Sequence, residues 1–586
     1  MRRPALTAIA STTTALSGGS GVPADAVRPP RRWPHVVGVG FIASVYAALY
    51  SLYLLTLHST LKDGLADVGE YDQAVSGYAH FMGPHSPFVG LTDTGSAGAL
   101  QLSDHFTPLL ALMAPGYWIH DGPQTLLIET GILAALPIIP LWLFARRAVG
   151  GRVRWPATLG AYLVVIGYGV TWPIQMALWF EFHEVFLAMP IMAWMLERAQ
   201  AGRLRQAALV SLLLLGVKDD MGFVVAAFGV YLAAKDVTAR RWAGLARRTV
   251  RDWKAPLRAV RHRDRPLFLA MVPVGLGMVL LVNRVLLPAF GGSPNRNFTY
   301  NEFGANTGQA LSAMAGDPWR VWTTLFDSPL KQQTLSMLLW PTLFLCLLSP
   351  IGLLGVPLLV ERFLSVNSLY WVMPYHYNAF LVPIVFCAGV DGAVRLSGWL
   401  TAYKELKLGE ESRRFTRSAL LAAFGAYVAI YGWTTAFRYP MHHMTESAFW
   451  DRNTPDIVSA KRAAAHVPSG VLVASATQVG PQLLGRDRVI MWSFPGDRDY
   501  PQTPWVLADT KRPSYPFASI EAQQADVQAR VRAGYRRRES GRRGAERCRN
   551  APTSRGCAAP RRRRCCWGNG CAGPRCTTPA GRGGRP

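Results

Sequence analysis

Long apolar runs separated by short polar segments dominate the chain. Residues 36–57, 123–145 and 266–288 are each long enough to cross the hydrocarbon core of a bilayer, which is about 30 Å thick. We expect further spans at 155–173, 184–200, 204–217, 221–235, 333–349, 351–365, 377–396 and 417–437. The pattern predicts an all-α polytopic membrane domain of about eleven transmembrane helices over residues 34–437.

The two ends of the chain follow different patterns. Residues 1–33 are rich in Ala, Ser, Thr, Gly and Pro, which predicts a disordered cytoplasmic N-terminus. After the last span, β-like runs alternate with a helix-like stretch, so we expect a small extracytoplasmic α/β domain over residues 438–534. In residues 535–586, Arg, Gly, Pro and Cys replace the aliphatic residues, and we predict a disordered tail. The abrupt change suggests the hypothesis of a shifted reading frame.

The formal net charge of +26 would suit a nucleic-acid-binding protein, but the distribution of the charge argues against one. Much of the excess lies in the tail. Much of the rest lies in short segments between predicted spans, at 146–154, 198–205, 235–265 and 404–417. Lys and Arg in short loops stay on the cytoplasmic side during insertion. We therefore predict a multi-pass plasma-membrane protein whose partners are membrane lipids and which binds no nucleic acid.

Ionisable residues follow several of the predicted spans. In the predicted topology, the external loop over 58–122 begins with an acidic motif, and residues 105–118 form an interfacial helix on the outer side. The ionisable residues expected on this outer face are Asp67, Asp72, His105, His183, Lys218 and His376. Such groups are costly at membrane level and usually have a function, so the sequence predicts a site at the outer face.

Five short motifs, in the expected order, resemble those of the DUF2079 family of predicted bacterial membrane proteins. They are D-x-G-x-[FY]-D-Q at 67–73, H-F-[ST]-P at 105–108, [DE]-F-H-P-[DE] from 181, V-K-E-D at 217–220 and H-Y at 376–377. Three departures are visible: Glu184 stands where the family usually has Pro, Asp219 stands where it has Glu, and the C-terminal end of the family pattern is lost to the tail. The resemblance covers roughly residues 40–530, and it implies a bacterial cell membrane as the location.

The layout of this family is similar to that of GT-C membrane glycosyltransferases. These enzymes have an acidic motif in the first external loop, many spans and often an external C-terminal domain. The resemblance implies a polyprenyl-phosphate-linked sugar as donor and a cell-envelope acceptor. Transfer of that sugar needs a base for the acceptor hydroxyl, and cationic groups or a divalent cation for the departing phosphate.

Asp72 is the first candidate for the base and Asp67 the second, although Asp67 could instead cap a helix beginning near Val68. The candidate contacts to substrate and phosphate are His105, His183, Lys218, Asp219, Asp220, His376 and Arg362. For Lys218 the structural alternative is an ion pair with Asp219 and Asp220 that satisfies a buried turn. Glu181 and His183 are the candidate ligands for a divalent cation, although no compact ligand motif surrounds them.

Two other classes of function stay open at this point. One is a transporter or flippase for a lipid-linked substrate, and the other is a non-enzymatic envelope assembly protein. A transporter is expected to show inverted repeats and broken helices with polar residues near the middle of the bilayer. We find no repeat, and the polar residues lie near one face, which favours an enzyme. An assembly protein would leave Asp72 and Lys218 dispensable.

Overall fold

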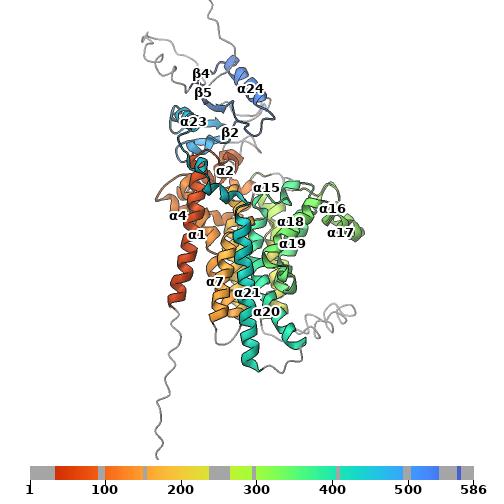
Figure 1. Cartoon of the computed structure of the whole chain (residues 1–586). Coiled ribbons are helices and arrows are strands. Elements are labelled where there is room, and N and C mark those ends of the chain that lie inside the picture. The colour runs from red at the N-terminus through yellow and green to blue at the C-terminus, as the bar shows by residue number, and fades with distance from the viewer. Residues whose placement is uncertain are drawn as a thin grey trace, which may run out of the picture.

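A computed structural model describes residues 33–89, 99–149, 155–235, 264–292, 298–403, 409–492, 503–539 and 564–568. The N-terminal segment, most of the basic loops and most of the tail lie outside these residues, so the predictions made for them stay predictions. The described part consists of a helical bundle with a small sheet domain at one end (Figure 1). The start of α1 (Trp33–Ser59) lies at the opposite end of the bundle.

Six helical segments among the described residues are long and apolar enough to cross a membrane. They are Pro34–Ser59, Pro123–Ala148, Trp155–Trp179, Arg265–Ala289, His376–Thr401 and Glu411–Ala436. Each coincides with a predicted span. Their elements are α1, α5 (Pro123–Ala135), α6 (Ile138–Ala148), α7 (Trp155–Gly169), α8 (Trp172–Trp179), α14 (Arg265–Leu281), η4 (Val282–Leu286), α15 (Leu287–Ala289), η9 (His376–Leu381), α20 (Val382–Tyr403) and α21 (Glu410–Ala436).

Many apolar side chains on these helices face outward. Val36 and Phe41 of α1, Leu280 of α14 and Ile430 of α21 are each more than half exposed. An apolar surface of this kind is unfavourable in water and favourable in lipid. The long helices therefore have both the length and the surface of membrane spans.

Glycine allows the closest helix pairs to approach. A Cβ atom added at Gly160 of α7 would lie 2.6 Å from the carbonyl oxygen of Leu421 in α21, and one at Gly425 would lie 2.5 Å from that of Gly160. A Cβ at Gly222, the first residue of α11 (Gly222–Ala234), would likewise lie 2.3 Å from the carbonyl oxygen of Gly275 in α14. Small residues at such crossings provide the close packing that holds membrane helices together.

The other predicted spans are shorter or interrupted. They correspond to α9 (Val185–Gln200), α10 (Leu204–Leu212) with η3 (Leu213–Gly216), and α11 (Gly222–Ala234). The stretch 333–365, predicted as two spans, differs most, because it contains α18 (Pro329–Leu339), η5 (Trp340–Thr342), η6 (Leu345–Leu348), η7 (Pro350–Gly355) and α19 (Val356–Phe363). Leu343 and Phe344 have φ angles of 50° and 58°, and such left-handed residues end a right-handed helix.

Short helices and turns connect the long elements. The segment predicted as an interfacial helix forms η2 (Pro108–Met113) and α4 (Ala114–Tyr117), with Leu112 and Trp118 exposed. The remaining elements are η1 (Gln101–Ser103), α16 (Thr307–Gly316), α17 (Pro318–Leu325), η8 (Ser368–Tyr370), η10 (Pro440–Thr445), α22 (Ser447–Trp450) and η11 (Gly480–Leu483).

The expected small α/β unit is present and its strands are parallel. They are β1 (Leu472–Ser475), β2 (Arg488–Met491), β3 (Trp505–Asp509), β4 (Arg536–Glu539) and β5 (Arg564–Gly568), in the order β2-β1-β3-β5-β4. The helices of this unit are α23 (Pro455–Ala465) and α24 (Ile520–Arg532). β4 and β5 come from the tail predicted to lack structure. Parallel pairing uses backbone groups, so a segment poor in aliphatic side chains can still extend a sheet.

One helix joins the two parts of the protein. α2 (Leu65–Ala79) lies between the long helices and the sheet domain (Figure 1). The side chain of Gln73 donates to the carbonyl oxygen of Val489 and accepts from its N–H, both at 3.0 Å. The N–H of Leu65 donates to the carbonyl oxygen of Thr477 at 2.9 Å. The acidic motif therefore lies on a helix that is hydrogen-bonded to the sheet domain.

Candidate functional site

Segments far apart in the sequence bring ionisable side chains together next to α2. All are buried or half-buried. This polar cluster comprises Asp67, Glu70, Asp104, His105, His183, Glu184, Lys218, Asp219, Asp220 and His376. Sequence analysis singled out Asp67, His105, His183, Lys218, Asp219, Asp220 and His376, and the structure brings these seven together.

An ion pair lies at the centre of the cluster. Lys218, on the turn before α11, donates to Glu184, the residue before α9, and the Tyr71 hydroxyl donates to the other carboxylate oxygen of Glu184. Burial alone lowers the pKa of Lys218, but Glu184, Asp220 and Asp219 outweigh it and raise that pKa well above its usual value. Lys218 is therefore a permanent cation whose main partner is Glu184, not the two aspartates of its own turn.

A histidine supplies a second positive charge. His105 Nδ1 lies 3.4 Å from Asp219 Oδ1. Burial lowers the pKa of His105 and so does Lys218, but Asp104, Asp219 and Glu184 outweigh both and raise it to about 10. At neutral pH His105 is an imidazolium.

Burial raises the pKa of two carboxyl groups of the cluster. Burial, followed by the neighbouring Asp104, raises the pKa of Glu70 well above its usual value. Burial also raises the pKa of Asp220 to about 8, although Lys218 opposes this shift. The cluster therefore combines acids of raised pKa with two permanent cations, and strongly shifted pKa values are typical of functional sites.

Some buried polar atoms of the cluster lack a hydrogen-bond partner among the described residues. His183 Nε2 lies 3.2 Å from Asp67 Oδ1, and the rings of His183 and His376 stack with centroids 3.4 Å apart. The Nδ1 atoms of both histidines and Oδ1 of Asp220 have no partner within the described chain. Because buried polar atoms are nearly always satisfied, these three atoms are candidates for contact with a ligand.

Asp72 faces a different environment from Asp67. The two residues are five positions apart on α2, which places them about 140° apart around the helix axis. Asp72 accepts a hydrogen bond of 2.8 Å from the Tyr117 hydroxyl, and its charged neighbours, Asp121 and His58, are not members of the polar cluster. The structure therefore does not bring Asp72 into the polar cluster with Lys218, because helical geometry turns Asp72 away.

The structure also bears on Asp67 and Arg362, two other residues singled out from the sequence. α2 begins at Leu65 with Gly64 at its N-cap, so Asp67 lies inside the helix and is not its cap. Arg362 is buried and donates to the carbonyl oxygens of Tyr370 and Tyr377 and, at 3.0 Å, to the side chain of Asn378. Arg362 therefore holds the loop that carries His376, and these bonds engage its guanidinium.

The predicted ligands for a divalent cation do not fit such a site. Glu181 is buried, and burial together with Asp63 and Asp67 raises the pKa of its carboxyl well above the usual value. Among the described residues, Glu181 and His183 belong to no group of three ligand atoms within 4.8 Å of one another.

Sequence reasoning missed Glu70, Asp104 and Glu184. Each stands beside a motif residue that it did find: Asp104 precedes His105, Glu184 follows His183, and Glu70 lies one helical turn after Asp67. The spacing of three residues between Asp67 and Glu70 on one helix could have predicted that Glu70 lies on the same face of α2. The pairing of Glu184 with Lys218 depends on the packing of α9 against the turn before α11, which no local pattern indicates.

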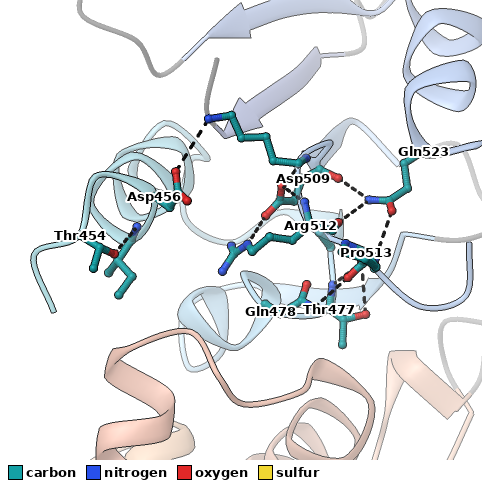
Figure 2. Close-up of polar contacts among 12 residues, drawn as sticks. Thr454, Asp456, Thr477, Gln478, Asp509, Arg512, Pro513 and Gln523 are labelled. Carbon is teal, nitrogen blue, oxygen red and sulfur yellow. Dashed lines mark hydrogen bonds and ion pairs between the residues drawn. The ribbon is translucent and has the colours of Figure 1, made fainter. Parts of the chain in front are cut away.

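The sheet domain has a pocket of its own, which lies beside the carboxyl end of β3. It is lined by Asp456, Ala460, Ala463, Val479, Leu507, Ala508, Asp509, Lys511 and Arg512. Figure 2 shows that its polar groups bond to one another: Asp509 accepts from Arg512 Nε at 2.7 Å and from the N–H of Lys511 at 2.9 Å. The polar cluster, with its unsatisfied buried atoms, is the stronger candidate site.

Comparison with known proteins gives one family match. A family model described as "Predicted membrane protein (DUF2079)" matches residues 57–542, a range that includes the whole polar cluster. No curated protein sequence is significantly similar to this chain. Among solved structures, the crystal structure of ArnT from Cupriavidus metallidurans in the apo state is 12% identical, covers 77% of this chain and 84% of its own, and has a TM-score of 0.36. A likeness at that TM-score establishes neither a shared fold nor a shared activity.

Proposed function

This chain belongs to DUF2079, a family of multi-pass membrane proteins, and from that premise we propose that it is a membrane glycosyltransferase of GT-C type. It moves a sugar from a polyprenyl phosphate to a cell-envelope acceptor on the outer side of the plasma membrane. The observation that carries the proposal is the convergence of Asp67, His105, His183, Lys218 and His376 at the end of the bundle beside the sheet domain.

The cations of the cluster are suited to a departing phosphate. In the proposed step, the acceptor oxygen attacks the anomeric carbon, the bond from that carbon to the phosphate oxygen breaks, and the polyprenyl phosphate leaves with the electron pair. Lys218 and His105 are positive at neutral pH and stabilise the charge that develops on the phosphate. The unpartnered Nδ1 atoms of His183 and His376 offer further contacts to it.

Asp67 is the carboxylate best suited to act as base. Its side chain is about a third exposed, while Glu70 is buried and has a raised pKa, which makes Glu70 less available as a carboxylate. The bond between Asp67 and His183 holds the carboxylate beside the histidine pair, where it can take the proton of the acceptor hydroxyl. Asp72 was the first candidate from the sequence. We prefer Asp67 because the Asp72 carboxylate bonds to Tyr117, which is not a member of the polar cluster.

The test uses a deletion strain complemented with single variants. Asp67→Asn keeps the size of the side chain and removes the base, so we expect transfer to fall by roughly 10²–10⁴-fold and lipid-linked sugar to accumulate. Lys511→Met, on the exposed side of the sheet domain, is the matched control and should restore the wild-type envelope glycan profile. Protein levels in the membrane fraction are measured for every strain.

Two results would contradict the proposal. Asp67→Asn that restores the full glycan profile would remove the assigned base. Purified protein that moves the lipid-linked sugar across a vesicle membrane without consuming it would favour the transporter or flippase. In that case the polar cluster would bind the phosphate but perform no sugar transfer.

A further inference from the structure

A second group of potential ligands lies away from the polar cluster. It follows α21, where the chain turns from the last long helix toward the sheet domain. His442 and His443 lie in η10, and Glu446 precedes α22. One ligand atom from each of these three residues lies within 4.8 Å of the others, and the side chains are one-third to one-half exposed. No role was predicted for them from the sequence.

The contacts of the two ring nitrogens of His442 indicate which nitrogen carries a hydrogen. His442 Nδ1 lies 2.8 Å from the carbonyl oxygen of Tyr439, which can only accept, so Nδ1 must carry a hydrogen. In a neutral imidazole, Nε2 then presents a lone pair. That lone pair faces Oε1 of Glu446 at 3.3 Å, which is also an acceptor. Two acceptors at this distance repel each other unless His442 is doubly protonated or a cation lies between them.

The distances suit a metal ion. Oε1 of Glu446 lies 3.3 Å from His442 Nε2 and 3.2 Å from His443 Nδ1. Zinc binds nitrogen and oxygen ligands at about 2.0–2.2 Å in a tetrahedron, which puts neighbouring ligand atoms about 3.3–3.6 Å apart. The bond from His442 Nδ1 to a backbone carbonyl is also the usual outer contact of a metal-binding histidine, since it fixes the tautomer with Nε2 free.

We propose that His442, His443 and Glu446 bind one Zn²⁺ ion, with the fourth position open to water. Two imidazoles and a carboxylate suit zinc among the abundant divalent metals. The ion stabilises the turn between the last span and the sheet domain. This turn also contacts α8. The N–H of Met441 donates to the side-chain oxygen of Gln175 at 3.2 Å, and the ring centroids of His443 and Trp179 lie 5.7 Å apart. The site is independent of the proposed sugar transfer.

The experiment uses full-length protein in detergent, purified without a histidine tag. Metal content is measured by mass spectrometry, and Co²⁺ is added to stripped protein to look for the visible absorption of tetrahedral cobalt. We expect one zinc ion per wild-type chain and a cobalt spectrum. His442→Ala and Glu446→Gln should each weaken zinc binding by more than about tenfold. His466→Ala, an exposed histidine at the end of α23, is the matched control and should bind as the wild type does.

A second readout separates loss of binding from loss of folding. Zinc binds only the folded site, so it should raise the unfolding temperature of the wild type and of His466→Ala but not that of Glu446→Gln. A wild-type chain that binds no zinc would overturn the proposal. Binding that survives both ligand substitutions would overturn it as well.

Discussion

The polar cluster and the pocket of the sheet domain contain similar residue types, yet they are organised in opposite ways. In the pocket, Asp509 bonds to Lys511 and Arg512, its neighbours two and three positions along the chain. In the polar cluster, Glu184 bonds to Lys218 and Tyr71, which come from other segments, and several buried polar atoms have no partner within the described chain. Local, self-satisfied contacts stabilise a turn, whereas distant, incompletely satisfied ones are expected of a binding site.

The largest expected effect tests the centre of the cluster. Lys218→Met leaves the Glu184 carboxylate buried without its cation, which should cost about 3–5 kcal/mol in the free energy of unfolding. Adding Glu184→Gln removes the unpaired charge, so the double variant should regain most of that stability but no sugar transfer. Chemical unfolding in detergent and glycan profiling measure the two properties. A double variant with full transfer would reduce the ion pair to a structural role.

An intermediate effect concerns Asp72 and pH. Burial raises its pKa from 3.8 to about 7 in the folded protein. The folded state therefore binds this proton more tightly than the unfolded state, so the contribution of Asp72 to stability is complete below pH 4 and is lost as the pH rises to 7. Asp72→Asn should remove this decline, which amounts to a few kcal/mol at about 1.4 kcal/mol per pKa unit.

Unfolding curves of wild type and Asp72→Asn between pH 4 and 8 make the measurement. Because Asp72 lies outside the polar cluster, the variant should also keep most of the sugar transfer. Parallel pH curves would show that Asp72 is ionised in the folded protein. Loss of transfer with unchanged stability would return Asp72 to the catalytic role that the sequence first indicated.

The smallest effect is expected in the sheet-domain pocket. Asp509→Asn weakens the bonds to Arg512 and to the N–H of Lys511 and should cost about 1 kcal/mol in the free energy of unfolding. Sugar transfer should not change at matched protein levels. A strong loss of transfer in this variant would contradict the distinction between the two regions, because it would make the pocket part of the functional site.

Some of this organisation could be read from the sequence because the relevant constraints are local. Apolar runs predict the six long helices, and the topology that they imply brings His105, His183, Lys218 and His376 to one region. The face of α2 was also predictable in principle: once Asp67 and Asp72 lie on one helix, their spacing separates them. The motif was predicted to lie in an external loop, and in a loop the spacing of the two acids does not indicate which way each side chain faces.

Other features depend on tertiary packing. The left-handed conformations of Leu343 and Phe344 break the stretch predicted as two spans, and nothing in those residue types favours such a conformation. The ion pair of Glu184 with Lys218 requires two segments to pack in one particular way. β4 and β5 pair through backbone groups, which leave no mark in side-chain hydropathy.

The two hydrogen bonds between Gln73 and Val489 couple the position of the acidic motif to the position of the sheet domain. A truncation that removes these two bonds would free α2 to shift relative to the long helices. A tilt of that helix would move Asp67 relative to His183 without any chemical change at either residue. The hold of the sheet domain on α2 would in this way set how often the carboxylate and the histidines are aligned.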